Sequence, residues 1–275
     1  MKNQLEAFLP ELNEADLIIL LSREEETLKR FCTSPLKEKM IIIREGKRGP
    51  LPDFCEDIRY VDVSLSLEET LYLTRFLDSV LFRVFIETPL KNKGTIVLLS
   101  DTPFKLVLQM RAEDVPLART MKELSDKIDP GALEALFKII FAIHREGREG
   151  KSIGTLFVVG DVESVLSYTQ QLIINPYQGQ PENLRKIQNP ENWESIKELA
   201  QLDGAFVMDR AGRIYCAGAY ILVKNGVRAH PGFGGRHLAA ASITQETDSV
   251  AFALSSSGTL RIFEDGKVVF QQDLG

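Results

Sequence analysis

The sequence is poor in the residues that build covalent or metal-based frameworks. Its 275 residues include three cysteines and three histidines. Cys32, Cys55 and Cys216 are odd in number and far apart, which argues against a disulfide framework and against a cysteine metal site. Such usage is typical of a reducing compartment, so we expect a cytoplasmic location.

The sequence also lacks long hydrophobic runs and a surplus of positive charge. No apolar run approaches the roughly 18 residues of a membrane-spanning helix, and residues 1–6 contain no hydrophobic signal region. We therefore expect no membrane partner. The formal net charge of −6 lacks the electrostatic footprint of a protein that binds duplex nucleic acid, so DNA is not expected as a partner.

Two common catalytic motifs are not supported. Residues 147–152 read G-R-E-G-K-S, which does not have the spacing of the phosphate-binding pattern G-x-x-x-x-G-K-[ST]. Residues 150–154 read G-K-S-I-G, but they precede an expected strand and do not form the strand-to-helix turn of a G-x-S-x-G nucleophile, so a hydrolase triad is unsupported. His144 lies among charged residues, which favours a solvated helix end over metal ligation, and His230 precedes a proline and has no ligand-spaced partner.

The composition is typical of a globular protein with a hydrophobic core, since 44% of the residues are hydrophobic. Short apolar runs alternate with helical patterns over residues 1–115, which predicts a smaller α/β domain with a regulatory or oligomerising role. The domain has a faint likeness to the C-terminal domain of pyruvate kinase. Strands are expected at 16–21, 39–43, 59–63, 95–99 and 104–109, and helices at 23–32 and 67–85.

A second domain is expected over residues 128–275, after a charged boundary region between Arg111 and Asp129. Asp129-Pro130 is typical of a helix start, and apolar residues follow at helical spacing. The pattern predicts a mixed β-sheet flanked by helices. Helices are expected at 161–174, from 190 and at 236–246, with a hairpin at 205–220, strands at 153–159, 249–255, 259–264 and 267–271, and a tight turn at Asp265-Gly266.

Three segments of the second domain carry residues suited to phosphate and metal chemistry. Asp203-Gly204-Ala205 places a carboxylate at a strand start, followed by two small residues that leave a smooth surface for a flat base. An Asp-Gly pair is, however, more often a plain turn. Gly234 and Gly235 precede Arg236 and His237 at a helix start, where backbone N–H groups and a guanidinium can hold phosphate. The alternative for this segment is a loop before a surface helix. The third segment, Ser255, Ser256 and Ser257, offers hydroxyls but equally fits a polar hairpin turn.

Taken together, the motifs resemble the diadenylate cyclase domain of the DisA type, over roughly residues 128–275. The soluble α/β region ahead of it is similar to the archaeal branch of that family. The matching segments are 154–161 (G-T-L-F-V-V-G-D), 175–176 (N-P), 202–205 (L-D-G-A), 219–221 (A-Y-I), 235–244 (G-R-H-L-A-A-A-S-I-T) and 247–250 (T-D-S-V).

The resemblance implies an enzyme that condenses two ATP into cyclic di-AMP and releases two pyrophosphates, at a face-to-face dimer of cyclase domains. It implies Asp203, Arg236 and His237 as catalytic residues, with Asp203 holding a divalent metal, Mn²⁺ or Mg²⁺. The nucleotide contacts that it implies are Gly204, Ala205, Tyr220, Ile221, Gly234, Gly235, Arg236, His237, Ser255, Ser256 and Ser257.

The sequence departs from the family pattern at two places. Gly235 and Leu238 stand where many members have a Thr and an Arg beside the Arg-His pair. The serine-rich turn lacks the acidic residue of much of the family and is a residue shorter. These departures favour the alternative of a catalytically weak sensor that binds adenine nucleotides. A DNA-scanning protein is a third possibility, which the acidic charge balance and the absence of a DNA-binding segment oppose.

Overall fold

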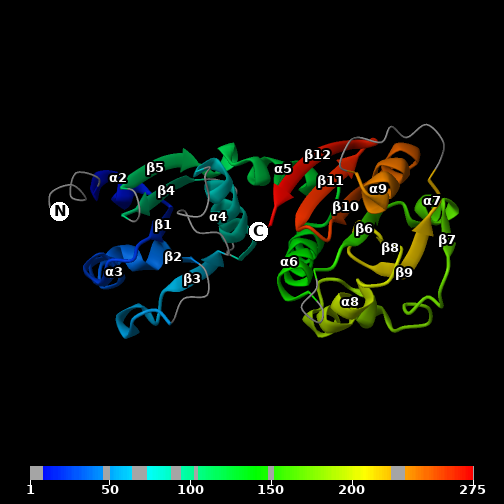
Figure 1. Ribbon diagram of the computed structural model, residues 1–275, viewed down its shortest axis with the longest axis horizontal. Coiled ribbons are helices and arrows are strands. Elements are labelled where there is room, and N and C mark those ends of the chain that lie inside the picture. The colour runs from blue at the N-terminus through cyan, green and yellow to red at the C-terminus, as the bar shows by residue number, and fades with distance from the viewer. Residues whose placement is uncertain are drawn as a thin grey trace. The chain divides into compact units, whose positions relative to one another are not determined.

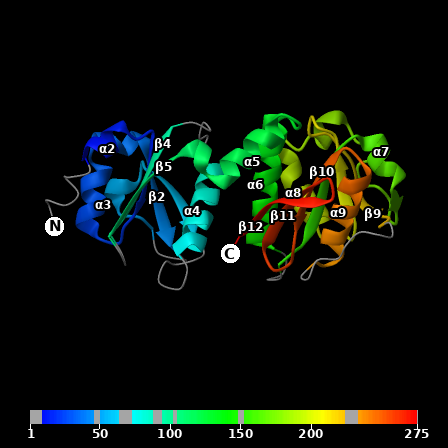
Figure 2. The same cartoon turned by 90° about the horizontal axis from the view of Figure 1, so that it is seen from above.

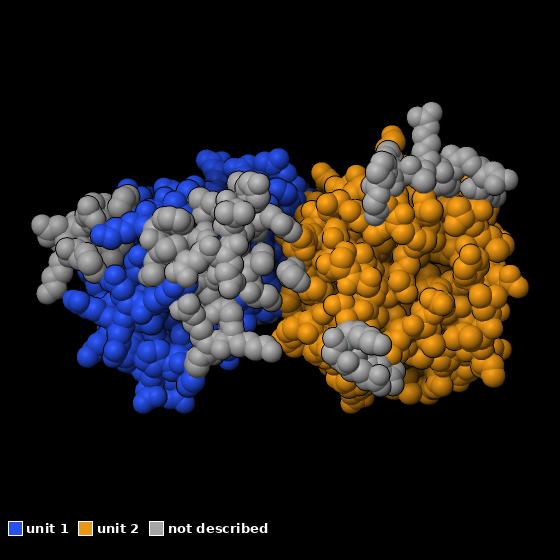
Figure 3. Space-filling model, viewed as in Figure 1, with its two compact units in different colours: residues 1–119, 275 blue, residues 120–274 orange. Residues whose placement is uncertain are grey.

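The computed structural model describes residues 9–45, 50–63, 73–87, 94–101, 105–147, 152–223 and 233–274. The chain divides into two compact units, residues 1–119 with 275, and residues 120–274 (Figure 3). The division falls inside helix α5 (Pro116–Ser125). Within the described ranges, no helix combines the length and the apolar composition that crossing a bilayer requires.

The N-terminal unit is a five-stranded sheet in the order β3-β2-β1-β4-β5. Strands β1 to β4 are parallel, and β5 runs antiparallel to β4. The elements are α2 (Leu9–Glu14), β1 (Leu17–Leu21), α3 (Glu25–Cys32), β2 (Met40–Glu45), β3 (Arg59–Val63), α4 (Leu73–Glu87), β4 (Thr95–Ser100) and β5 (Leu106–Arg111), with 3-10 turns at Pro35–Lys39, Asp53–Cys55 and Ala112–Asp114.

The central strand β1 is buried at every position, because helices cover both faces of this sheet. Ile18 and Leu20 pack in one core cluster with Leu28 and Phe31 of α3, and α4 lies on the opposite side (Figure 2). A continuous apolar run is the expected pattern for such a doubly covered parallel strand. Residues 64–72 and 102–104 lie outside the described residues, so the predicted starts of the helix at 67 and of the strand at 104 do too.

The C-terminal unit is a seven-stranded mixed sheet in the order β12-β11-β10-β6-β8-β9-β7 (Figure 1). Only β6 and β8 pair in parallel; the other five pairs are antiparallel. The elements are α6 (Pro130–Glu146), β6 (Thr155–Gly160), α7 (Val162–Ser167), β7 (Thr169–Gln171), α8 (Trp193–Leu199), β8 (Ala205–Met208), β9 (Ile214–Ile221), α9 (Gly235–Glu246), β10 (Ser249–Leu254), β11 (Thr259–Glu264) and β12 (Lys267–Asp273), with 3-10 turns at Glu182–Arg185 and Pro190–Asn192.

Helices pack on both faces of this sheet, so the predicted α/β class with a mixed sheet is confirmed. Ala240 and Ile243 of α9 join Val158 and Ala251 of the sheet in one core cluster. On the opposite face Phe137 of α6 packs edge-on against Phe252, with ring centroids 5.8 Å apart. Because α9 packs on the sheet, its N-terminus lies beside the ends of strands of the same unit.

The helix predicted at 161–174 is too long. Asp161 caps the helix start as expected, accepting a hydrogen bond from the Glu163 N–H, but α7 ends at Ser167. Residues 169–171 instead form the edge strand β7, in which Thr169 pairs with Ile221 of β9. Pairing with a distant strand outweighs local helix propensity here, and a single-sequence pattern does not contain that information.

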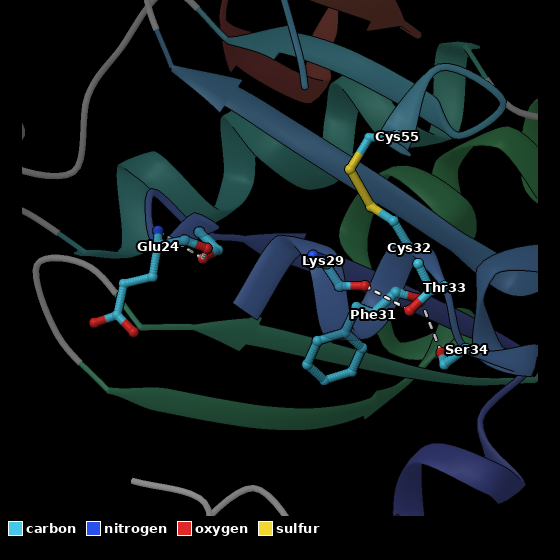
Figure 4. Close-up of a disulfide and its surroundings, with 8 residues drawn as sticks. Glu24, Lys29, Phe31, Cys32, Thr33, Ser34 and Cys55 are labelled. Atoms are coloured by element: carbon cyan, nitrogen blue, oxygen red, sulfur yellow. Dashed lines mark hydrogen bonds between the residues drawn. A yellow bond between two sulfur atoms is a disulfide. The ribbon is translucent and has the colours of Figure 1, made fainter. Parts of the chain in front are cut away.

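The expectation that no cysteines pair is wrong for two of the three. Cys32, the last residue of α3, forms a disulfide with Cys55 in the 3-10 turn Asp53–Cys55 (Figure 4). The two cysteines are 23 residues apart in sequence, and their Cα atoms lie 5.4 Å apart. Only the packing of α3 beside this turn brings them together. Cys216 remains a buried thiol.

Candidate active site

Arg236 lies where four separate segments of the C-terminal unit meet. It is the second residue of α9, and its Nη2 atom is 3.7 Å from Oδ1 of Asp203, which lies just before β8. A Cβ atom added to Gly154, just before β6, would lie 2.9 Å from Arg236 Nη1 and 3.1 Å from the backbone nitrogen of Ser256, after β10. The fold therefore gathers residues of three predicted motifs, together with Gly154, around one guanidinium.

Asp203 presents its carboxylate to solvent, with its side chain 97% exposed. The adjacent Gly204 has φ +109°, and a Cβ there would lie 2.5 Å from the carbonyl carbon of Gly218 on β9. A glycine is therefore required at this position by the backbone conformation and by the close approach of β9. The close neighbour of Gly204 is thus a strand of the same sheet.

Gly234 and Gly235 differ from Gly204 because nothing described in the fold requires them to be glycine. Gly234 is the N-cap of α9 with φ −84°, and Gly235 is the first helical residue. No described atom lies within 4 Å of a Cβ built at either position. The His237 N–H donates to Gly234 O at 3.0 Å, whereas the N–H groups of Gly235 and Arg236 precede the hydrogen-bonded ladder of the helix. The open space beside the glycines would give an anion access to these two donors.

His237 faces into the unit and is 4% exposed. Its Nε2 atom lies 3.0 Å from Nη1 of Arg261 on β11, and its ring packs against Phe233 and Phe263. Burial, followed by the charges of Arg261 and Arg236, lowers the pKa of His237 from 6.5 to about 4. The imidazole is therefore neutral at pH 7, and Nε2 accepts from Arg261 because a guanidinium only donates.

This arrangement leaves the proton of His237 on Nδ1, which is buried and has no hydrogen-bond partner among the described residues. The ring is thus not part of the exposed group formed by Asp203 and Arg236. Its predicted catalytic and nucleotide-binding role stays a prediction. In the structure its ring contacts Arg261.

Arg261 contacts the predicted site residue His237 but was not itself predicted from the sequence motifs. Besides His237, it donates through Nε to Gln271 Oε1 at 2.8 Å, and its guanidinium carbon lies 5.6 Å from the centre of the Phe233 ring. Its partner His237 lies 24 residues earlier in the chain. Only the packing of α9 on β11 brings the two together, so no local pattern could have revealed the pair.

The serine-rich segment closes the hairpin between β10 and β11. Ser255 Oγ accepts a hydrogen bond from Thr259 N–H at 3.0 Å and lies 2.8 Å from Ser257 Oγ. Gly258 N–H donates to Ser255 O, and Gly258 has φ +87°. The hydroxyls of Ser255 and Ser257 are thus used in the turn, while Ser256 is exposed and has its backbone nitrogen beside Gly154 and Arg236.

Three of the residues predicted to contact the nucleotide, Ala205, Tyr220 and Ile221, lie on neighbouring strands. Ala205 of β8 pairs with Ala219 of β9, which places Tyr220 at the same end of the sheet as Asp203. Tyr220 is 50% exposed, whereas Ala205 and Ile221 are buried in the core. Among these three, only Tyr220 offers side-chain surface to a ligand.

A metal cage built from protein side chains alone is not found in the part of the chain that the structure describes, where no group of three His, Cys, Asp or Glu residues converges. Asp203 is the one predicted ligand. Magnesium is commonly held by one or two carboxylates together with substrate phosphates and water. A single exposed carboxylate beside an anion-binding helix start fits that kind of site, in which the metal arrives with a triphosphate.

The comparisons with known proteins point to the same unit. Residues 142–268 match the family described as "DisA bacterial checkpoint controller nucleotide-binding". This stretch of the C-terminal unit is therefore similar to that family, which confirms the predicted resemblance.

Two similar curated proteins are both called diadenylate cyclase. The one from Methanocaldococcus jannaschii is 38% identical over 179 residues, which cover 62% of this chain and 57% of the relative. The one from Haloferax volcanii is 32% identical over 151 residues, covering 54% and 55%. The chain thus spans little more than half the length of these relatives. A solved structure of DacA from Staphylococcus aureus is 17% identical with a TM-score of 0.38, covering 52% of this chain and 87% of that one.

Proposed function

We propose that this protein is a diadenylate cyclase, which condenses two ATP into cyclic di-AMP with release of two pyrophosphates. The observation that carries the proposal is the convergence of Asp203, Arg236 and the open glycines of α9 at one end of the sheet. The family match of residues 142–268 supports it, as do the names of the two archaeal relatives. We place the reaction in the cytoplasm, where ATP is supplied.

In this proposal the start of α9 holds the triphosphate. The N–H groups of Gly235 and Arg236 at the start of α9 and the helix dipole favour negative charge. Gly234 and Gly235 allow phosphate oxygens to reach the backbone, since no described atom fills the space of their missing side chains. Arg236 adds a permanently charged planar donor that is already near Asp203.

Arg261 extends this positive region. Its guanidinium is fixed by Gln271 and by the neutral His237. We propose that Arg261 compensates for the Arg that many family members have at the position of Leu238. His237 then acts through Arg261, and not by contact with the phosphates.

Asp203 is the proposed holder of the divalent metal, and in this proposal it helps to activate the ribose 3′-hydroxyl. When bound, Mn²⁺ or Mg²⁺ would neutralise charge on the triphosphate. The contribution of the protein is mainly positioning: α9 and Arg236 orient the α-phosphate, and Ser256 lies beside them. Tyr220, exposed at the same end of the sheet, provides a surface on which adenine can pack.

The product requires two active faces. Cyclic di-AMP is two-fold symmetric, and each ATP must supply the nucleophile that attacks the other. One copy of the C-terminal unit contains one set of these residues, so we propose that two copies face each other across a two-fold axis with one ATP each. Self-association through the C-terminal unit is therefore part of the mechanism.

The direct test is product formation from ATP with Mn²⁺ or Mg²⁺, measured by chromatography and mass spectrometry. We expect wild type to form cyclic di-AMP. Asp203→Asn should lose activity by at least a hundredfold while remaining folded, because a neutral amide replaces an exposed anionic oxygen.

A matched control is Asp209→Asn at the other end of β8. The Asp209 carboxylate accepts hydrogen bonds from Ala211 and Arg213 N–H in the hairpin turn, a role that an asparagine oxygen can retain. This variant should keep wild-type activity. Near-normal turnover by Asp203→Asn, with the protein folded, would remove Asp203 from the mechanism.

A catalytically weak sensor of adenine nucleotides remains the second candidate. The observations that favour it are the neutral residues Gly235 and Leu238 beside the Arg-His pair and the lack of an acidic residue in the serine-rich turn at 255–258. Saturable binding of ATP without any cyclic di-AMP over extended incubation with either metal would establish this alternative.

A further inference from the structure

Three consecutive aliphatic side chains are exposed on the surface of the C-terminal unit. Leu172 is 57% exposed, Ile173 42% and Ile174 91%. They follow β7, the strand at one edge of the sheet (Figure 1), and we call residues 172–174 the apolar ridge. An uninterrupted run of exposed aliphatic residues is uncommon on a monomeric protein and marks a surface that another molecule covers.

The apolar ridge is anchored to β9 at both of its ends. Before it, Gln171 pairs with Ala219 and donates through Nε2 to Ala217 O at 2.7 Å. After it, Asn175 Nδ2 donates to Tyr215 O at 2.8 Å. The fold itself therefore keeps the ridge at the surface. A surface that is already ordered loses little conformational entropy when a partner binds.

The apolar ridge also borders the candidate nucleotide site. A Cβ atom added to Gly218 would lie 2.7 Å from Ile173 Cδ1 and 3.7 Å from the carbonyl oxygen of Asp203. Gly218 also lies against Gly204, since a Cβ there would be 2.5 Å from the Gly218 carbonyl carbon. One residue without a side chain thus separates the ridge from the backbone of Asp203 and Gly204. A molecule that covers the surface around Asp203 therefore reaches the ridge as well.

The apolar ridge lies within a long uncharged segment, since no Asp, Glu, Lys or Arg occurs between Glu163 and Glu182. Exposed edge strands usually carry charges that prevent association with other chains, and this edge segment has none. In a two-fold contact each surface meets a copy of itself, so charged residues there would repel each other. A neutral apolar surface fits such a contact, whereas it offers nothing to a partner that is recognised by its charge.

From these observations we propose that the apolar ridge packs against the same ridge of a second copy of this chain, beside the two-fold axis on which the two nucleotide sites face each other. This inference rests on the proposed function, because that mechanism brings a second copy to the surface around Asp203. It assigns the contact that holds the two copies together to Leu172, Ile173 and Ile174. Burial of these aliphatic side chains supplies the free energy of association.

Charged substitutions at Ile174 test the contact, because this side chain is 91% exposed and substitutions at such positions rarely disturb folding. Ile174→Asp and Ile174→Lys each place like charges opposite each other in a self-pair. Each should weaken association of the full chain by about a hundredfold or more, measured by sedimentation velocity over a range of concentrations. The affinity for ATP, measured by calorimetry, should not change. Unaltered association in both variants would overturn the proposal.

A mixture of the two variants gives a stricter test. Subunits with Ile174→Asp and Ile174→Lys carry opposite charges at the proposed contact, so in an equimolar mixture they should associate about tenfold or more tightly than either variant alone. Val269→Asp and Val269→Lys are the matched controls, since Val269 is an exposed aliphatic residue (45%) on β12, at the other edge of the same sheet. These controls should associate like wild type. Dissociation of both Ile174 variants without recovery in the mixture would overturn the contact between the two ridges.

Turnover separates this inference from the proposed function. Wild type that associates through the ridge but makes no cyclic di-AMP would keep the contact and reject the cyclase. Wild type that makes cyclic di-AMP, with Ile174 variants that associate and turn over normally, would keep the cyclase and reject the contact. If both hold, turnover per subunit in each Ile174 variant should fall with the fraction of paired subunits and recover in the mixture.

Discussion

Arg236 reaches Asp203 across 3.7 Å, and the missing side chain of Gly154 leaves the space that its guanidinium occupies. At the residue scale the candidate site thus depends on the missing side chain of Gly154 as much as on the charges of Arg236 and Asp203. His237 shows the opposite relation, since its ring fills a buried position and its charge is suppressed. Arg236 and His237 are neighbours in sequence, but Arg236 lies beside the exposed Asp203, whereas His237 is buried and contacts Arg261.

The suppressed charge of His237 predicts that acid destabilises the C-terminal unit. Its pKa is about 4 in the fold and 6.5 as the ordinary value. Below pH 6.5 the unfolded state binds a proton that the folded state does not, so stability is lost progressively as the pH falls from 6.5 to about 4. The loss should approach roughly 3 kcal/mol from this residue.

Urea unfolding followed by tryptophan fluorescence measures this effect, because the single tryptophan, Trp193, lies in α8 of the same unit. His237→Gln should flatten the dependence of the unfolding free energy on pH between 6.5 and 4. An unaltered slope in His237→Gln would show that other groups cause the acid sensitivity.

At the scale of elements, the sequence predicted most strands and the mixed sheet correctly, because apolar alternation and turn residues are local signals. Asp265-Gly266 is an example: both residues have positive φ and join β11 to β12. The edge strand β7 was missed, since its existence depends on β9. For the site, the motifs identified Asp203 and Arg236, whereas Arg261 and the burial of Ile221 and His237 depend on how α9 and β9 pack.

Gly204 and Gly235 lie in different surroundings, so replacing each by alanine should affect the stability of the protein differently. Gly204→Ala should lower the unfolding free energy by about 2 kcal/mol or more, since its Cβ would meet the β9 backbone at 2.5 Å with φ at +109°. Gly235→Ala should leave stability unchanged or slightly higher, because its Cβ meets open space and alanine favours helix.

The same Gly235→Ala variant should bind ATP more weakly and turn over more slowly, since the methyl group occupies the space through which phosphate reaches the backbone. Stability from tryptophan fluorescence and ATP affinity from calorimetry separate the two effects. A Gly235→Ala protein with wild-type affinity and turnover would rule out backbone capture of phosphate at this helix start.

At the scale of the whole molecule, each unit has its own sheet and its own core, so a change in one can be measured separately from the other. The disulfide between Cys32 and Cys55 closes a loop across 23 residues of the N-terminal unit. Its loss should lower the stability of that unit by roughly 3 kcal/mol, through greater entropy of the unfolded chain.

Hydrogen exchange with mass spectrometry on the oxidised and reduced protein checks this prediction. Amides of β1 and β2 should lose protection on reduction, and those of β6 and β10 should not. Cys32→Ser with Cys55→Ser should reproduce the reduced state. Cys216→Ser, which removes a buried thiol in the other unit, serves as the control. Equal protection in the oxidised and reduced protein would show that the bond contributes no stability.

The proposed two-fold arrangement predicts that inactive subunits suppress active ones. If wild type is mixed with a threefold excess of Asp203→Asn and the subunits exchange freely, about one quarter of the wild-type subunits remain in wholly active pairs. Activity per wild-type subunit should fall by the same factor. The same excess of Asp209→Asn should add activity instead. Unchanged activity per wild-type subunit in the Asp203→Asn mixture, with exchange verified, would contradict a shared site.

The order in which paired strands follow one another along the chain also determines when each unit can fold during synthesis. The sheet of the N-terminal unit is complete once β5 has been made, since its most distant pair joins β1 to β4. In the C-terminal unit β6 lies between β8 and β10, and Val159 pairs with Val250. Contacts between such distant residues form slowly. A ribosome-bound chain therefore carries a folded N-terminal unit while the strands that support the nucleotide site are still unpaired, and that interval exposes their edges to aggregation.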